Sequence, residues 1–177
     1  TDYNHPCEIL GDLQFIRRKR GSLDGLNVVF AGEVTNLCMS WFEAAMKLPI
    51  TVTQVSPARY HLSGEKLDMF NRNAKGRISV MDSLENAVDS STDVIYTDSW
   101  PKDRDKSEIR SDFIPYQITK DIVDRMNPSG FFLPCPPVSR GEEISSDSLE
   151  SDRYLNFEAK KYLLHAQNAV MSFLASE

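Results

Sequence analysis

Four side chains that can take part in binding or catalysis stand where predicted helices begin and predicted strands end: His5, Asn36, Asp98 and Cys135. An imidazole at a helix entrance can sit beside a bound anion, because the first backbone N–H groups of a helix favour negative charge. An amide such as Asn36 both donates and accepts hydrogen bonds, and a carboxylate such as Asp98 can hold an ammonium group. Type and place together make these four residues candidates for a ligand site.

Each of the four also has an ordinary structural interpretation. His5 precedes Pro6, and proline is favoured in the first turn of a helix. Asn36 suits a helix N-cap, and Asp98 suits a turn after a strand. A single cysteine at a strand end is more often a small buried apolar residue than a functional one. Residue type alone therefore favours the structural interpretation for His5 and for Cys135.

The elements that must position these residues alternate between strand-like and helical segments. This alternation predicts an α/β fold, a three-layer α/β/α arrangement with a mostly parallel, Rossmann-like sheet of about five strands. The predicted strands are residues 26–31, 51–55, 78–81, 93–97 and 131–133, and the predicted helices are 5–20, 36–48, a segment capped by Ser63, 83–89, 107–126 and 152–174. Ile9, Leu10, Leu13 and Ile16 recur at helical spacing, and Pro115 must kink or split the helix over 107–126.

Ligands in such folds sit beyond the carboxyl ends of the strands. That rule selects residues 32–36, 57–61, 98–102 and 135–140 as the functional edge. Asn36, Asp98 and Cys135 fall within these segments, so the strand order alone predicts that they lie at one rim of the sheet.

Charge and composition exclude several classes of partner. The chain has 177 residues and a formal net charge of -6, whereas nucleic-acid binding needs a basic face. The one dense basic run, residues 17–20, is typical of a solvated helix end. No apolar stretch has the length of a membrane span. Cys7, Cys38 and Cys135 have neither disulfide-framework nor zinc spacing, so we expect no metal, no cofactor and a cytoplasmic setting.

Several segments, taken together, resemble the aspartate/ornithine carbamoyltransferase (transcarbamylase) family. His5-Pro6-Cys7-Glu8 with Asp12-Leu13 resembles the family's HPxQ-x-x-x-D-L segment, and Gly32 to Asn36 with Ser40 resembles its Gly-Asp-x-x-Asn loop. Asp93 to Trp100 resembles the D-V-x-Y-T-D-x-W segment, and Leu133 to Pro137 resembles H-C-L-P. Leu164 to Gln167 resembles part of the closing helix. Any one of these motifs is weak, but five in the right order are specific.

The resemblance covers the whole chain and only the C-terminal half of the family's subunit. It implies that residues 1–177 are the ornithine- or aspartate-binding domain, without the carbamoyl-phosphate-binding domain that carries a Ser-x-Arg-Thr loop. The helix over 152–174 is then expected to pack on that other domain. Family members are usually trimers with shared active sites, so a homo-trimer or higher oligomer is expected.

The implied activity is transfer of a carbamoyl group from carbamoyl phosphate to the amine of ornithine or a related amino acid, as in arginine biosynthesis. By resemblance, the catalytic residues are His5, Asp98 and Cys135. The implied substrate-binding residues are Asn36, Asp98, Ser99, Asp2, Cys135 and Pro136, and the implied carbamoyl-phosphate-binding residues are His5, Glu8, Lys160 and Lys161. Cys135 is not expected to act as a covalent nucleophile. The chain alone is not expected to catalyse carbamoyl transfer.

Four segments depart from the family pattern. Glu8 replaces the glutamine of HPxQ, and Pro134 and Pro136 replace the histidine and leucine of H-C-L-P. Pro101-Lys102-Asp103-Arg104 stands where ornithine enzymes carry Ser-Met-Gly, and no arginine precedes Leu164. Lys160 or Lys161 can replace that arginine as a point charge but not as a bidentate fork.

These departures leave more than one function open. The main hypothesis is an active ornithine-type transcarbamylase. The alternative is a weakened or inactive relative that binds an amino acid or a partner subunit. An unrelated nucleotide-binding α/β domain is disfavoured, because Gly32 lacks the companions of a G-x-G-x-x-G loop.

Overall fold

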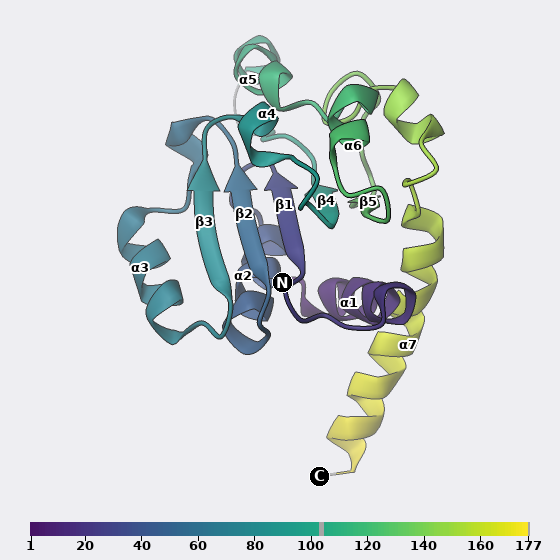
Figure 1. Cartoon of the computed structure of the whole chain (residues 1–177). Coiled ribbons are helices and arrows are strands. Elements are labelled where there is room, and N and C mark those ends of the chain that lie inside the picture. The colour runs from purple at the N-terminus through teal and green to yellow at the C-terminus, as the bar shows by residue number, and fades with distance from the viewer. Residues whose placement is uncertain (103–104, 177) are drawn as a thin grey trace.

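The computed structural model describes residues 1–102 and 105–176, so Asp103 and Arg104, in the polar loop predicted after Trp100, lie outside the described residues. A five-stranded sheet forms the centre, in the order β3-β2-β1-β4-β5, and every pairing is parallel (Figure 1). The strands are β1 (Asn27–Ala31), β2 (Thr51–Val55), β3 (Arg77–Met81), β4 (Val94–Thr97) and β5 (Phe131–Pro134). The predicted parallel α/β sheet is confirmed.

Helices cover both faces of this sheet, as predicted. They are α1 (Pro6–Arg20), α2 (Asn36–Lys47), α3 (Gly64–Asn73), α4 (Leu84–Ala87), α5 (Lys106–Phe113), α6 (Lys120–Arg125) and α7 (Asn156–Ala175), with 3-10 turns at Ala58–Tyr60, Ile114–Tyr116 and Asp147–Glu150. Side chains of α1, α2, α3 and α7 share one apolar cluster with one face, and those of α4 and α6 share a second cluster with the other. The chain therefore forms three layers.

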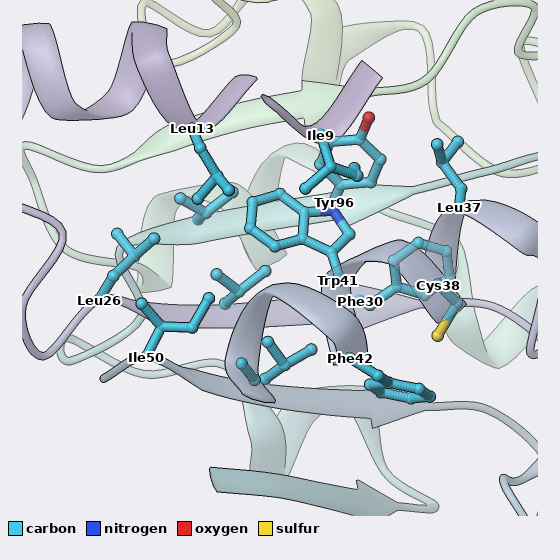
Figure 2. Close-up of a cluster of buried hydrophobic side chains, with 14 of the residues drawn as sticks. Ile9, Leu13, Leu26, Phe30, Leu37, Cys38, Trp41, Phe42, Ile50 and Tyr96 are labelled. Atoms are coloured by element: carbon cyan, nitrogen blue, oxygen red, sulfur yellow. The ribbon is translucent and has the colours of Figure 1, made fainter. Parts of the chain in front are cut away.

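Alternate residues of each strand supply the two clusters, since successive side chains of a strand point to opposite faces. In β1, Val28 and Phe30 join the cluster under α1 and α2, whereas Val29 and Ala31 join the other. Figure 2 shows Trp41 of α2 packed among strand side chains, and its ring lies 5.4 Å from that of Tyr96 at 71°. Burial on both faces explains the mostly apolar sequences of β1 and β5.

Three local predictions need correction or refinement. Leu10 is exposed, so its assignment to the apolar face of α1 is wrong; Glu8 and Asp12 are buried on that helix instead. Ser63 is the N-cap residue of α3, but its side chain makes no capping hydrogen bond. The helix predicted over 107–126 is split into α5, a 3-10 turn and α6 around Pro115, as the proline indicated.

The strand order reverses between β1 and β4. From β1 the chain moves outward to β2 and β3, then returns to the other side of β1 to form β4 and β5. Such a switch point opens a crevice at the carboxyl ends of the two central strands, where open α/β sheets bind ligands. In the part of the chain that the structure describes, no helix is long and apolar enough to cross a membrane.

Candidate functional site

The loops that follow β1, β4 and β5 lie side by side at the carboxyl edge of the sheet. Ala31 pairs with Thr97, and Thr97 pairs with Pro134, so Gly32, Asp98 and Cys135 begin three neighbouring loops. The Thr97 hydroxyl donates to the Ala31 carbonyl oxygen over 2.7 Å, and the Cys135 backbone N–H donates to the Thr97 carbonyl oxygen over 2.8 Å. The switch point thus lies between the Gly32 and Asp98 loops.

Glu143 ties the loops after β4 and β5 together, a role that the sequence did not indicate. Its carboxylate is 2% exposed and accepts hydrogen bonds from the backbone N–H groups of Trp100, over 2.9 Å, and Ser139, over 2.6 Å. The Ser99 hydroxyl also donates to the Pro137 carbonyl oxygen over 3.0 Å. These bonds fix the loop that carries Asp98 relative to the loop that carries Cys135.

The N-terminal segment reaches the same edge across the start of α2. The His5 backbone N–H donates to Ser40 Oγ over 2.8 Å, and Asn36 Nδ2 donates to the Thr1 carbonyl oxygen over 2.8 Å. Thr35 is the N-cap of α2, because its side chain accepts from the Cys38 backbone N–H. The interpretation of Asn36 as a plain N-cap is therefore wrong, and its amide is used between segments instead.

His5 and Asp98 keep their side chains available. His5 is exposed and is the N-cap position of α1 without a side-chain capping bond. Asp98 is half-buried, and its Oδ1 accepts from the Ser99 backbone N–H over 2.8 Å. Both residues fit a role toward a ligand more closely than a role in the core.

Cys135 is buried beside negative groups. Burial, with a smaller contribution from the charges of Glu8 and Asp98 and against the opposing charge of Lys160, raises the pKa of its thiol to about 12. The Cys135 Sγ lies 4.0 Å from Glu8 Oε1, which joins the loop after β5 to the first turn of α1. The thiol stays protonated at neutral pH, so Cys135 can contact a ligand but is not an activated nucleophile.

The remaining predicted site residues fall into two groups. Asp2 and Pro136 are exposed on the segments that border this edge. Lys160 is held in ion pairs, with Nζ 2.6 Å from Glu8 Oε1 and 2.9 Å from Asp12 Oδ2. Lys161 is exposed and lines a shallow hollow with Lys19, in the last turn of α1 and at the opposite end of that helix from Glu8.

A hollow of about 610 Å³ adjoins the site. It is lined by Trp100, Pro101, Lys102, Lys106, Ser107, Ile109, Arg110, Ser139 and Glu142. Neither Asp98 nor Cys135 belongs to this lining, so the hollow borders the candidate site on the side of α5.

Asp12, which pairs with Lys160, and Tyr96 were identified from the sequence only as parts of motifs, with no role of their own. The Tyr96 hydroxyl donates to Asp12 Oδ2 over 2.8 Å. A signal was present for Asp12, which follows Glu8 by four residues and so lies on the same face of α1. Tyr96 lies within a buried strand, where local sequence gives no sign of a polar partner.

A doubly wound α/β domain whose loops at the switch point carry an amide, a carboxylate and a thiol belongs to the class of ligand-binding α/β domains.

Comparison with known proteins identifies the family. Residues 24–174 match the family described as aspartate/ornithine carbamoyltransferase, Asp/Orn binding domain. The chain is 32% identical to an ornithine carbamoyltransferase of Thermococcus kodakarensis, over 98% of this chain and 57% of that protein. It is 33% identical to one of Syntrophus aciditrophicus, over 98% of this chain and 58% of that protein. The chain thus belongs to the aspartate/ornithine carbamoyltransferase family, as its motifs indicated.

Solved structures agree with this assignment. The ornithine carbamoyltransferase of Pyrococcus furiosus superimposes with a TM-score of 0.86 at 32% identity, covering 97% of this chain and 56% of that one. The enzyme from Gloeobacter violaceus gives a TM-score of 0.85 at 25% identity, covering 97% of this chain and 59% of that one. The chain therefore spans little more than half the length of its relatives.

Proposed function

We propose that this chain supplies the amino-acid-binding half of a carbamoyltransferase. The donor is carbamoyl phosphate, and the acceptor is the amine of ornithine or a related amino acid. One observation supports the proposal: His5, Asn36, Asp98 and Cys135 come from separate segments, and hydrogen bonds join those segments to one another. Membership of the family supports the choice of reaction.

The proposed roles follow from the groups present. The amine nitrogen bonds to the carbonyl carbon, the C–O bond to phosphate breaks, and the amine proton leaves with inorganic phosphate. His5 donates to the carbamoyl oxygen as negative charge develops on it. Asp98 holds the ammonium group of the amino acid, Asn36 and Ser99 contact its head group, and Cys135 lies by the reacting amine. Glu8 faces the donor.

The donor's phosphate needs a second domain, which we propose docks against α7. This helix extends past the sheet at its C-terminal end (Figure 1). Its exposed apolar residues include Phe157, Leu164 and Met171, which follow one another at seven-residue spacing and so share one helix face. We further propose that the complete protein assembles as a homo-trimer or higher oligomer.

Ureido-product formation by the full-length protein tests this function. The assay supplies carbamoyl phosphate with ornithine and with a panel of shorter, longer and acylated amines. The His5→Ala variant should lose about 100-fold or more in kcat, the effect of removing one oxyanion donor, while its melting temperature stays unchanged because His5 is exposed. An unchanged rate would remove His5 from the mechanism.

One observation favours the second candidate function, a weakened or inactive relative that binds an amino acid or a partner subunit. Lys160, one of the two lysines that can replace the absent arginine, is already held in ion pairs with Glu8 and Asp12. An inactive relative predicts no product with any amine, yet a rise in melting temperature on adding an amino acid. Product formation above the uncatalysed rate would exclude the inactive form, and a rate near that of ornithine carbamoyltransferases would exclude the weakened form as well.

A further inference from the structure

A buried group of ionisable side chains joins α1, α7 and the sheet: Glu8, Asp12, Tyr96, Cys135 and Lys160. Lys160 Nζ lies within 3.1 Å of both Asp12 carboxylate oxygens and 2.6 Å from Glu8 Oε1. The Tyr96 hydroxyl donates to Asp12 Oδ2, and Tyr96 belongs to the same apolar cluster as Ile9 (Figure 2). Glu8 and Asp12 are four residues apart on α1, so one ammonium group reaches both.

Lys160 is the only cation that the structure places in this group. Burial lowers the pKa of Lys160, but attraction to Asp12 and hydrogen bonding to Glu8 outweigh burial, so its pKa is raised overall. Burial raises the pKa of Asp12 and, much more, that of Tyr96, which stays neutral. The ammonium group of Lys160 is therefore shared between the carboxylates of Glu8 and Asp12.

Stability alone does not account for such a group. Replacing a buried ion pair by apolar residues of similar size is often neutral or stabilising, because burying charges is costly. The position of the group is more informative. The oxygen that Lys160 holds, Glu8 Oε1, is also the one that lies 4.0 Å from Cys135 Sγ. Lys160 thus fixes a carboxylate in the wall of the candidate site.

Glu8 stands where the family motif has a neutral glutamine. An unpaired carboxylate there would repel an anionic donor. A carboxylate has about four acceptor positions, so Glu8 can hold Lys160 and still accept a hydrogen bond from the NH2 of a carbamoyl group. The ion pair with Lys160 therefore removes the repulsion that a carboxylate at this position would exert on an anionic donor.

We propose that Lys160 is a positioning residue of the carbamoyl-transfer site, which neutralises Glu8 and orients its carboxylate beside Cys135. This inference rests on the proposed function. It predicts that loss of Lys160 weakens binding of carbamoyl phosphate in ground state and transition state alike. Uniform weakening raises KM and leaves kcat nearly unchanged.

The test compares Lys160→Met, Glu8→Gln, the double variant and Lys160→Arg in the full-length protein. KM for carbamoyl phosphate is measured at saturating amine, below each variant's melting temperature. Lys160→Met should raise this KM about tenfold or more, with kcat changed far less. The double variant should recover most of the loss, because it removes the unpaired charge together with its partner, and Lys160→Arg should recover part. Lys120→Met, which removes an exposed lysine paired with Asp124, is the matched control and should leave KM unchanged.

The outcomes separate this inference from the proposed function. A Lys160→Met enzyme with wild-type KM and only a lower melting temperature would reduce Lys160 to a structural residue. A double variant no better than Lys160→Met would equally overturn the pairing with Glu8. If Lys160→Met does not fold, KM for carbamoyl phosphate is compared between the wild type, Lys160→Arg and the double variant. Neither variant leaves Glu8 unpaired, so both should keep a KM closer to that of the wild type than a tenfold rise. A tenfold or greater rise in both would overturn the inference. If the wild type forms no product, the proposed function fails, and titration calorimetry with carbamoyl phosphate on the same variants still measures whether Lys160 supports binding.

Discussion

Cys135 shows how burial decides the chemistry of a residue type. With a pKa of about 12, roughly one Cys135 thiol in 10,000 is ionised at pH 8. Cys38 is fully buried, and its pKa is also raised by burial and by the charge of Asp98. Cys7 is half-buried. The three cysteines should therefore differ widely in reactivity.

We predict that an aromatic disulfide reagent at pH 8 labels Cys7 quickly and Cys135 slowly. Peptide mapping after timed quenching gives the rate at each position. The Cys7→Ser variant should lose the fast phase, and Cys135→Ser should keep it. The rate at Cys135 should keep rising as the pH increases toward the pKa of its thiol, as far as the fold survives. Fast labelling of Cys135 at pH 8 would contradict a protonated, buried thiol.

The positions of loops that follow strands were predictable at the residue scale. Strand order placed the loops that lead to Asn36, Asp98 and Cys135 at one edge of the sheet, and the parallel pairing of β1, β4 and β5 agrees with that order. The roles of the three side chains toward a ligand stay predictions. Glu143 and Lys160 act through partners far along the chain, 43 residues away for Trp100 and 148 for Asp12. No local pattern carries such a contact.

At the scale of elements, the packing of α1 on α7 holds the ion pair of Lys160. Gly11 lies where the backbones of the two helices come close together. A Cβ added there would lie 2.9 Å from the backbone nitrogen of Leu163 and 3.0 Å from its Cα. Because these are backbone atoms, the helices must move apart to accept a side chain. Glu8 and Asp12 flank Gly11, and Lys160 is one turn from Leu163, so the separation should also loosen the ion pair.

We predict that Gly11→Ala lowers the free energy of unfolding by about 1–3 kcal/mol, the usual effect of overpacking. Urea unfolding followed by circular dichroism measures the change. Gly64→Ala is the control, because nothing lies within 4 Å of a Cβ at that helix start, and it should be neutral or stabilise by about 0.5 kcal/mol. A Gly11→Ala protein as stable as the wild type would show that α1 and α7 are not held this closely.

The elements themselves were predictable to within a few residues, for a physical reason. A parallel strand buried on both faces is a short apolar run, as in residues 26–31, and the alternation of strand-like and helical segments located the other four strands. The apolar face of α1 was less predictable. Leu10 is exposed, whereas Glu8 and Asp12 are buried. The two carboxylates can be buried because Lys160, from a helix that is far along the chain but packed on α1, balances their charges. Hydrophobic periodicity assumes that charges face water, and paired charges break that assumption.

At the scale of the whole molecule, the unusual feature is the apolar face of α7. Phe157, Leu164 and Met171 are 75%, 61% and 60% exposed. Phe173 and Leu174 near the helix end are also exposed. An apolar face of this extent marks an interaction surface in a soluble protein. The chain spans 57% of the length of its Thermococcus relative, and the proposed first domain is the occupant that we expect for this face.

The proposed docking of α7 makes a prediction for the chain in both contexts. In the 177-residue chain alone, the exposed face should drive self-association at high concentration, and Leu164→Asp with Met171→Asp should abolish it in sedimentation velocity. Circular dichroism should be unchanged, because both side chains are exposed.

In the full-length protein the same pair of substitutions should lower the melting temperature, since each charge would be buried against the first domain without a partner. Lys161→Asp, on an exposed position of the same helix beside Lys19, controls for adding acid to α7. Equal melting temperatures for the double variant and wild type, together with unchanged sedimentation of the isolated chain, would show that this face meets water in both contexts and that the first domain docks elsewhere.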